Sequence, residues 1–468
     1  MKKSYATACC LLGLLGVPVS SMNLNLARPW SSQSSKPHNP NLAFYSKSSD
    51  SLLFEAGTQE LTLYCRSALR SIDMVWSLHF NQVKQPFLTG MATALPNNLF
   101  KIRFKTDDLP AGFYDLRVEL DSGTGKKEKG VCTFGLGVEG MQIHDSRPSD
   151  FKTFWNSQLA SSAKVPLDPR IESESKLFSG KEIDQYNLDS ACLPGNYDPE
   201  GCRFETVESY KISYAGPRGE RVYGWLAKPV GPGPFPLMLV LPGAGFAPRP
   251  RPLEHARHGY LALDIQIHGQ DVDLEDYERI AGYYRDTAVY EPVEANYFRD
   301  VYLRAQRAID YLLQLPEAQP DKLVAVGGSQ GGRLAVVVAG LDPRVQAIVP
   351  CITNSGNDPH LEWVRHLNEA KIHPSPTSHM DQTAFSESSD RDHCIAYYDP
   401  MNFAPDVHCP VYMNAGLIDP ISPAFSTWAV FQQLESEDKT FVPLPGLGHD
   451  WSAEFDRQAW RWLEAKLQ

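Results

Sequence analysis

The segment 323–339, Leu-Val-Ala-Val-Gly-Gly-Ser-Gln-Gly-Gly-Arg-Leu-Ala-Val-Val-Val-Ala, places one serine between two stretches of different character. The first is an apolar run typical of a buried strand, and the second is an apolar stretch typical of a helix. Ser329 lies at the junction, with Gly327 before it and Gly331 and Gly332 after it. Side chains at 327 and 331 would collide across a sharp turn, and Gly332 lets the helix approach the sheet. The segment therefore predicts a strand, a strained turn and a helix whose N-terminus faces the Ser329 hydroxyl.

Strands and helices alternate along the chain from residue 141 to the C-terminus. The expected strands cover residues 222–229, 237–241, 260–265, 323–326, 347–349, 411–414 and 441–442. Helices are expected at 150–159, 297–312 and 453–466; within 297–312 the apolar residues form one stripe at helical spacing. This alternation predicts an α/β domain over 141–468, built on a doubly wound, mostly parallel sheet.

Two polar residues follow strands in the order that a serine nucleophile needs. A serine hydroxyl reacts poorly unless a base takes its proton and an acid orients that base. In α/β-hydrolases the acid and then the histidine follow the serine, each after a strand. Asp419 follows the strand expected at 411–414, and His449 follows the strand at 441–442. We therefore expect an α/β-hydrolase fold in which Ser329, Asp419 and His449 are the catalytic residues.

An oxyanion formed at such a serine needs two backbone N–H donors. We expect the first from Gln330 and the second from Ala244, in the loop after the strand at 237–241. Other carboxylates compete with Asp419 for the role of acid. Asp399 and Asp406 precede the strand, and Asp450 directly follows the histidine, so none of them has the expected position.

Residues 46–140 show a different pattern, in which apolar and polar residues alternate strictly. The alternating segments are 61–66, 76–80, 100–105 and 114–120, and a further strand includes Cys132, Phe134 and Leu136. Period-two patterns separated by turn residues predict an all-β, immunoglobulin-like sandwich ahead of the α/β domain. Its exposed aromatic residues leave sugar binding open, and the alternative is a spacer that packs against the enzyme.

The N-terminus has the features of a secretory signal peptide over residues 1–21. Lys2 and Lys3 precede an apolar run over 6–19, and the small residues Ser20 and Ser21 follow it. We expect a secreted or periplasmic protein, with a linker over 22–45. No segment is long enough to span a bilayer, so stable membrane insertion is not expected. The early position of Cys9 and Cys10 leaves a lipid-anchored protein as the lesser alternative.

The net charge and the spacing of His and Cys residues argue against nucleic acid and metal ions as partners. The chain of 468 residues has 44 Lys plus Arg against 56 Asp plus Glu, a formal net charge of -12. Nucleic acid is not an expected partner, because phosphate binding requires a basic surface. No His and Cys residues have the spacing of a zinc site, so neither a metal nor a cofactor is expected.

An exported chain permits disulfides. We expect bonds between Cys65 and Cys132, which lie on the apolar sides of their strands, and between Cys192 and Cys202, which bracket a loop. Buried free thiols are the alternative for both pairs.

Five segments resemble the acetyl xylan esterase and cephalosporin C deacetylase family. They are Gly-Gly-Ser-Gln-Gly-Gly at 327–332, His-Gly-Gln at 268–270, Gly-Leu-Ile-Asp at 416–419, Gly-His at 448–449 and the helix at 297–311. The resemblance implies a serine esterase that removes acetyl groups from sugar esters through an acyl-serine, without a cofactor. Its substrate would be an acetylated xylo-oligosaccharide or another small acetyl ester.

The chain departs from that family at three positions. His268 stands where the family usually has arginine, Ala244 where it has tyrosine, and Asp450 where it has glutamate. We expect His268 to support the site and not to react. Two other functions remain open: a serine peptidase of the prolyl oligopeptidase type, although no propeller repeat precedes the hydrolase segment, and a non-catalytic carbohydrate-binding surface protein. The oligomeric state is left open.

A long connection separates the strands expected at 347–349 and 411–414. It holds about sixty residues, more than a crossover needs. Its apolar residues include Trp363, Met380, Phe385, Tyr397 and Tyr398. We expect a partial lid that narrows the acyl pocket and favours acetyl over longer acyl groups. The alternative is an extra helical layer on the sheet.

Overall fold

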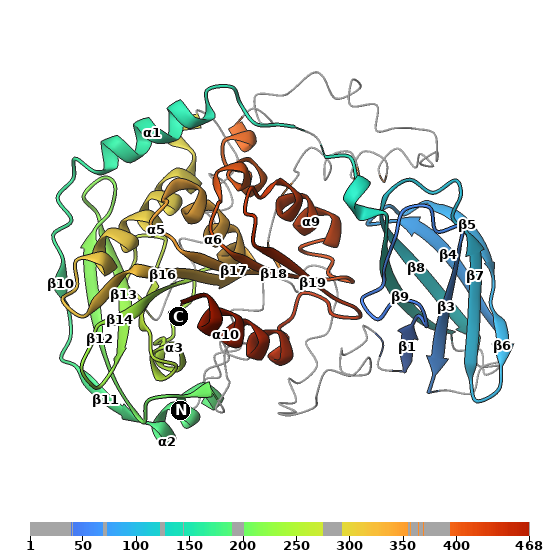
Figure 1. The fold of residues 1–468 in the computed structure, drawn as a ribbon, viewed down its shortest axis with the longest axis horizontal. Coiled ribbons are helices and arrows are strands. Elements are labelled where there is room, and N and C mark those ends of the chain that lie inside the picture. The colour runs from blue at the N-terminus through green and yellow to red at the C-terminus, as the bar shows by residue number, and fades with distance from the viewer. Residues whose placement is uncertain are drawn as a thin grey trace.

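A computed structural model of the chain describes residues 39 and 41–467, apart from 69–72, 122–126, 144, 190–200, 275–292 and 354–393. Within the last gap, Gly356, Val364 and Asn368 are described. The expected signal peptide lies outside the described residues. A β-sandwich lies beside a larger α/β unit (Figure 1). No helix in the described part of the chain is both long and apolar enough to cross a membrane.

The α/β unit is built on one ten-stranded sheet. Its strands are β10 (Arg170–Ile171), β11 (Lys176–Ser179), β12 (Thr206–Ala215), β13 (Arg221–Pro229), β14 (Phe235–Leu241), β15 (Leu261–Ile265), β16 (Ala318–Gly328), β17 (Ala347–Cys351), β18 (Val411–Gly416) and β19 (Lys439–Leu444). Their order is β10-β12-β13-β15-β14-β16-β17-β18-β19, with β11 paired to β12. Strands β14 to β19 pair in parallel, whereas β12 and β13 are antiparallel. The predicted α/β-hydrolase fold is confirmed.

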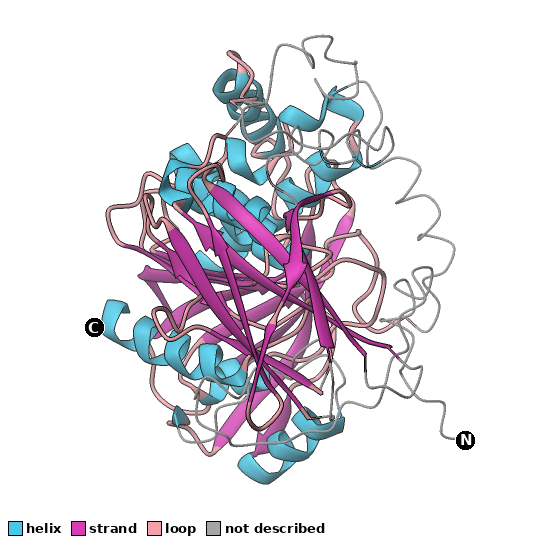
Figure 2. Cartoon of the chain, turned by 90° about the vertical axis from the view of Figure 1, so that its right-hand side faces the viewer, coloured by secondary structure: helices cyan, strands magenta, loops and turns pink. Residues whose placement is uncertain are grey.

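Helices cover both faces of this sheet because its strands are apolar on both sides. Leu237 and Leu239 of β14 belong to one core, whereas Met238 between them belongs to another. The helices are α1 (Phe151–Ser162), α2 (Gly180–Asp189), α3 (Leu253–Arg257), α5 (Tyr297–Leu313), α6 (Gln330–Leu341), α9 (Ala424–Gln433) and α10 (Ala453–Leu467), with short 3-10 turns η4 (Val293–Ala295), η6 (Pro400–Asn402) and η7 (Ala404–Asp406). Helices α1, α5, α6 and α9 share the first core, and α10 packs in the second. Figure 2 shows α10, at the C-terminus, apart from the helices on the other side of the strands.

The sandwich has a four-stranded and a five-stranded sheet. The first contains β1 (Leu42–Tyr45), β3 (Glu60–Ser67), β6 (Thr93–Leu95) and β7 (Leu99–Lys105); the second contains β2 (Leu53–Phe54), β4 (Asp73–Phe80), β5 (Pro86–Met91), β8 (Gly112–Asp121) and β9 (Lys127–Leu136), and η2 (Val138–Gly140) follows. Alternate residues of β3 and β7 face the core; Leu61, Leu63 and Cys65 of β3 are buried. The expected linker does not extend to residue 45, because Leu42–Tyr45 already pairs with β3.

The expected bond between Cys65 and Cys132 is wrong. Both residues are buried in the sandwich core, on strands of opposite sheets, and both are free thiols. Burial raises the pKa of the Cys65 thiol to about 12, so it remains protonated and packs as a small apolar group. The other expected bond is not tested, because Cys192 lies outside the described residues.

The sandwich packs against the α/β unit through helix α9. The indole Nε1 of Trp428 donates a hydrogen bond to the Val138 carbonyl at 2.9 Å, and its ring meets the edge of Phe113. Farther along, the Asn368 side chain accepts from the Lys84 N–H at 2.6 Å and donates to the Gln82 carbonyl at 3.0 Å. These contacts agree with the interpretation of the sandwich as a unit packed on the enzyme.

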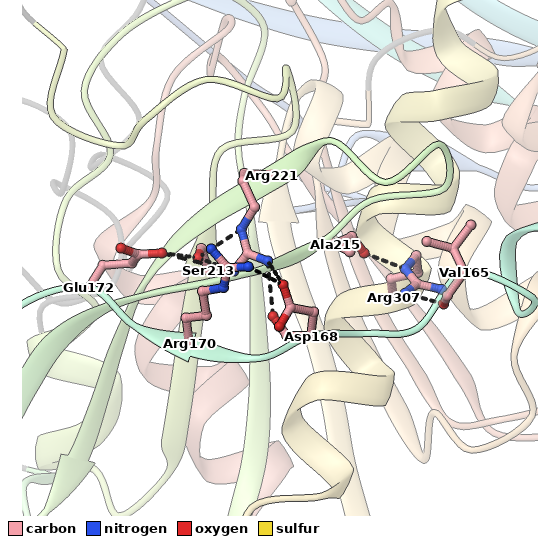
Figure 3. A network of polar contacts seen from close by, with 8 residues as sticks. All are labelled: Val165, Asp168, Arg170, Glu172, Ser213, Ala215, Arg221 and Arg307. Carbon is pink, nitrogen blue, oxygen red and sulfur yellow. Dashed lines mark hydrogen bonds and ion pairs between the residues drawn. The ribbon is translucent and has the colours of Figure 1, made fainter.

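A polar network fastens the segment after α1 to the first strands of the sheet (Figure 3). The buried Arg307 of α5 donates to the carbonyls of Ser162, Val165 and Ala215, at 2.8, 2.9 and 2.5 Å. Beside it, Arg221 of β13 donates to the carbonyl and carboxylate of Asp168, at 2.9 and 3.0 Å. The irregular segment between α1 and β10 thus has partners for its backbone carbonyls.

Candidate active site

The turn between β16 and α6 is as strained as its glycines predict. Ser329 has φ 58° and ψ -120°, a conformation that an L-residue adopts only when its surroundings enforce it. A side chain at Gly331 would place its Cβ 2.2 Å from the Leu241 carbonyl oxygen, and one at Gly327 would meet the same oxygen at 2.7 Å. A Cβ at Gly332 would lie 2.7 Å from the Cys351 carbonyl oxygen. All three glycines are therefore required by close approach of backbone to backbone.

Ser329, His449 and Asp419 form one chain of hydrogen bonds. The Ser329 Oγ lies 3.0 Å from the Nε2 of His449, and the Nδ1 of His449 lies 2.7 Å from Oδ2 of Asp419. A carboxylate can only accept, so Nδ1 carries the proton and Nε2 is free to accept the serine proton. His449 comes from the loop between β19 and α10 and Asp419 from the loop after β18, the positions that the sequence predicts.

Asp419 is held in place by its own loop. Its side chain is fully buried, and Oδ1 accepts hydrogen bonds from the N–H groups of Ile421 and Ser422, at 2.7 and 2.9 Å. These bonds direct Oδ2 toward the histidine. The competing carboxylates have other partners: Asp399 caps η6, and Asp406 pairs with Arg147.

The two residues expected to line an oxyanion site lie at neighbouring strand ends. Gln330 opens α6, so its N–H belongs to the positively polarised first turn of the helix. Ala244 lies in the loop after β14, which pairs directly with β16. The chain order of the strands reverses at β14, and ligand sites of open α/β sheets lie at such a reversal.

Three side chains hold the Ala244 loop: His268, which the sequence predicts to support the site, and Asp264 and Gln266, which sequence reasoning missed. They alternate along β15 and its continuation. Asp264 accepts from Arg249 through both oxygens, at 2.7 and 2.9 Å. The amide of Gln266 donates to the Ala247 carbonyl at 3.1 Å, and His268 bonds to the Gly245 carbonyl at 3.2 Å. Each step of two residues forward along 264, 266 and 268 is matched by a step of two residues back along the loop, at 249, 247 and 245. The loop is therefore clamped along its length, and the i, i+2 spacing of polar residues after a buried strand was the available signal.

His268 has a defined proton arrangement. The Gly245 carbonyl only accepts, so Nε2 of His268 donates to it, and Nδ1 accepts from the Tyr297 hydroxyl at 2.6 Å. The imidazole also packs on Phe246, with ring centroids 4.0 Å apart. Burial lowers the pKa of His268 to about 3, so the ring is neutral near pH 7. The structure thus gives His268 the supporting position that the sequence predicts.

Another overlooked side chain, Trp451, covers the turn next to Ser329. A Cβ added to Gly328 would lie 2.3 Å from the Trp451 indole, so the glycine makes room for the ring.

Tyr397 and Tyr398 do not belong to the lid that the sequence predicts. Both are buried and pack on Phe154. Trp363, Met380 and Phe385 lie outside the described residues, so the lid itself is not tested.

A group of side chains that could together bind a metal ion lies away from this site. Among the described residues, one group of His, Cys and carboxylate side chains brings its ligand atoms within 4.8 Å of one another: Cys202, Glu254 and His258. Spacing along the sequence gave no sign of it, because Cys202 and Glu254 lie far apart in the chain.

The model of the acetyl xylan esterase family matches residues 179–466. The chain belongs to this family. A curated relative, the acetyl esterase Axe7A of Xylanibacter ruminicola, is 27% identical over 369 residues, covering 76% of this chain and 75% of the relative. Membership of the acetyl xylan esterase family makes the chain a carboxylic ester hydrolase.

Two solved structures share the fold. The acetyl xylan esterase from Paenibacillus sp. R4 has a TM-score of 0.50 at 22% identity, and acetyl xylan esterase 1 from Thermoanaerobacterium sp. JW/SL YS485 has a TM-score of 0.52 at 18% identity. Each comparison covers 70% of this chain and 98% of the solved chain. Because 70% of this chain is covered, the fold shared with these two esterases need not include the sandwich.

Proposed function

We propose that this esterase removes acetyl groups from small acetylated carbohydrates through an acyl-serine intermediate. The observation that carries the proposal is the hydrogen-bonded chain from Ser329 through His449 to Asp419, in a member of the acetyl xylan esterase family. Substrates of the acetylated xylo-oligosaccharide type are supported by the names of the related proteins.

In the proposed mechanism, Nε2 of His449 takes the Ser329 proton as Oγ attacks the acetyl carbonyl. The N–H groups of Gln330 and Ala244 stabilise the oxyanion, and Asp419 stabilises the imidazolium. As the tetrahedral intermediate collapses, the carbon–oxygen bond to the sugar breaks and His449 gives its proton to the departing sugar oxygen, which is released as a hydroxyl group; acetyl-Ser329 remains. Water attacks this ester in a second round of the same steps, with His449 as base, and releases acetate.

The test is hydrolysis of p-nitrophenyl acetate and release of acetate from acetylated xylo-oligosaccharide. Ser329→Ala should lower kcat/KM on the order of 10⁴-fold or more, with unchanged thermal unfolding. Asp419→Asn should lower it strongly as well, because the amide disfavours the productive tautomer. Asp450→Asn changes the carboxylate next to His449 and is the matched control, which should retain activity. Ser329→Ala with wild-type activity, or cleavage of a proline-containing peptide in place of acetyl esters, would refute the proposal.

We also propose export of the chain, supported by the lysines and apolar run that precede residue 21. The measurement is the N-terminal sequence of the mature protein in the periplasmic or culture fraction. A mature protein that begins at Met1 would contradict export.

A further inference from the structure

Three side chains of types that can bind metals, Cys202, Glu254 and His258, lie together near helices α2, α3 and α10; Glu254 and His258 are buried, and Cys202 is partly buried. Glu254 belongs to α3, and His258 directly follows that helix. The segment that holds Cys202 lies against the end of α3, because the N–H groups of Arg203 and Phe204 both donate to the Arg257 carbonyl, at 2.9 and 3.1 Å. The cluster therefore joins residues that the chain order separates.

Two distances within the cluster match those between ligands of one tetrahedral zinc ion. Oε1 of Glu254 lies 3.5 Å from Nε2 of His258 and 3.4 Å from Sγ of Cys202. With a Zn–S bond of about 2.3 Å and Zn–N and Zn–O bonds of about 2.1 Å, tetrahedral geometry separates neighbouring ligand atoms by about 3.4 to 3.6 Å. Glu254 is thus at the spacing of neighbouring ligands from both Cys202 and His258, and all three ligand atoms lie within 4.8 Å of one another.

His258 supplies an independent sign that a ligand belongs here. The residue is only 3% exposed; its Nδ1 has no hydrogen-bond partner, and the Glu254 carboxylate, 3.5 Å away, is the neighbour of its Nε2. A buried imidazole nitrogen that has only a long contact with a carboxylate forgoes free energy that a metal–nitrogen bond would recover. The ring is also fixed in orientation, because it stacks on Trp460 of α10 with centroids 4.0 Å apart and planes 3° apart.

The surroundings orient the other two ligands. Asn187 of α2 donates to Oε2 of Glu254 at 2.8 Å, which leaves Oε1 directed at Cys202 and His258. Arg257 donates from Nε to the Cys202 sulfur at 2.7 Å, and an N–H donor of this kind stabilises a thiolate bound to a metal.

The net charge of the side chains in and around the cluster would balance a divalent cation. Arg257 carries one positive charge, which Asp184 meets at 2.7 Å, and Glu254 adds a second negative charge. With Cys202 bound to the metal as a thiolate, the charges of Cys202, Glu254, Asp184 and Arg257 sum to about -2, which a Zn²⁺ ion neutralises. A donor set of thiolate, imidazole and one carboxylate favours zinc over the hard cations Mg²⁺ and Ca²⁺.

We propose that Cys202, Glu254 and His258 bind one zinc ion, with water as the fourth ligand, and that this ion joins the segment before β12 to helix α3 beneath α10. Binding forms a Zn–S bond and releases the thiol proton to solvent. The role is structural, and the proposal is independent of the acetylesterase mechanism.

The test uses the full-length mature protein, stripped with a chelator and then titrated with Zn²⁺ or Co²⁺. We expect one zinc per chain by elemental analysis, a higher unfolding temperature with zinc, and a thiolate-to-cobalt charge-transfer band with Co²⁺. Cys202→Ser and His258→Gln should weaken zinc binding about tenfold or more and, for Cys202→Ser, remove the charge-transfer band. Ester hydrolysis by the folded variants should change little.

Two variants serve as matched controls. His255→Gln alters the neighbouring buried histidine, which also contacts Trp460 but lies outside the cluster, and Cys409→Ser alters a partly buried thiol elsewhere. Both should keep one zinc per chain. Wild-type protein without stoichiometric zinc, zinc retained equally by Cys202→Ser, or a mapped disulfide from Cys202 to Cys192 would each overturn the proposal. The cobalt spectrum of the wild type remains decisive if His258→Gln fails to fold.

Discussion

His268 shows how one neutral ring can position a backbone loop. Its Nε2–H holds the Gly245 carbonyl while the Tyr297 hydroxyl donates to Nδ1, so the peptide next to Ala244 is fixed from the side of β15. His268→Ala should lower kcat for p-nitrophenyl acetate about tenfold, less than the loss of an oxyanion donor itself, with KM nearly unchanged. His268→Gln offers an N–H in a similar place and should recover part of kcat.

Steady-state kinetics of both variants separate positioning from folding. A positioning role predicts lower kcat with unchanged thermal unfolding, and recovery by glutamine. Equal kcat in His268→Ala and the wild type would show that the other clamps, Asp264 and Gln266, suffice to hold the loop.

Trp451 bears on acyl-chain length, because its indole covers the turn beside Ser329. A wild-type preference for p-nitrophenyl acetate over butyrate and octanoate is expected. Trp451→Ala removes the ring and should raise the ratio of octanoate to acetate kcat/KM about tenfold or more, since one methylene of misfit costs about 1 to 3 kcal/mol. Trp451→Phe keeps an aromatic wall and should stay near the wild-type ratio. An unchanged ratio in Trp451→Ala would place the ring outside the acyl pocket.

At the scale of elements, α5 anchors the segment before the sheet through Arg307 (Figure 3). Three carbonyls lose a buried donor in Arg307→Met, and we expect the free energy of unfolding to fall by about 3 kcal/mol. Urea denaturation measures this change. Arg170→Met is the matched control: its ion pair with Asp168 is solvent exposed, and such pairs contribute about 0 to 1 kcal/mol. Similar losses in both variants would contradict the buried-donor explanation.

At the scale of the whole molecule, buried histidines should make the protein sensitive to acid. Burial lowers the pKa of His255 to about 4 and that of His268 to about 3. Below the unfolded pKa of about 6.5, the unfolded chain binds protons that the folded chain does not, so stability falls as pH falls. Between pH 6 and 4 each ring should contribute a loss of about 1.4 kcal/mol per pH unit at most.

Urea denaturation at several pH values tests this contribution. His255→Gln removes one titrating group without touching the catalytic residues, and it should flatten the dependence of stability on pH between 6 and 4. Parallel curves for His255→Gln and the wild type would show that this ring does not titrate on unfolding.

The amino-acid sequence alone determined the features that depend on local period and chain order. Glycines around Ser329 predict a sharp turn, because a Cβ at Gly327 would lie 2.7 Å from the backbone of Gly331 within the turn itself. The strand-end positions of Asp419 and His449 follow from the order of elements, because all parallel strands present their carboxyl ends at one edge. The alternation in the sandwich specifies its inner faces in the same way.

Tertiary structure decided which distant side chains meet. The clamps at Asp264, Gln266 and His268 depend on the path of a neighbouring loop, and whether Cys65 and Cys132 form a bond depends on how two sheets pack. Cys202 approaches Glu254 and His258 only because the segment before β12 folds back along α3. Sequence period specifies the face of an element on which a side chain lies, whereas its partner is set by the packing of elements far apart in the chain.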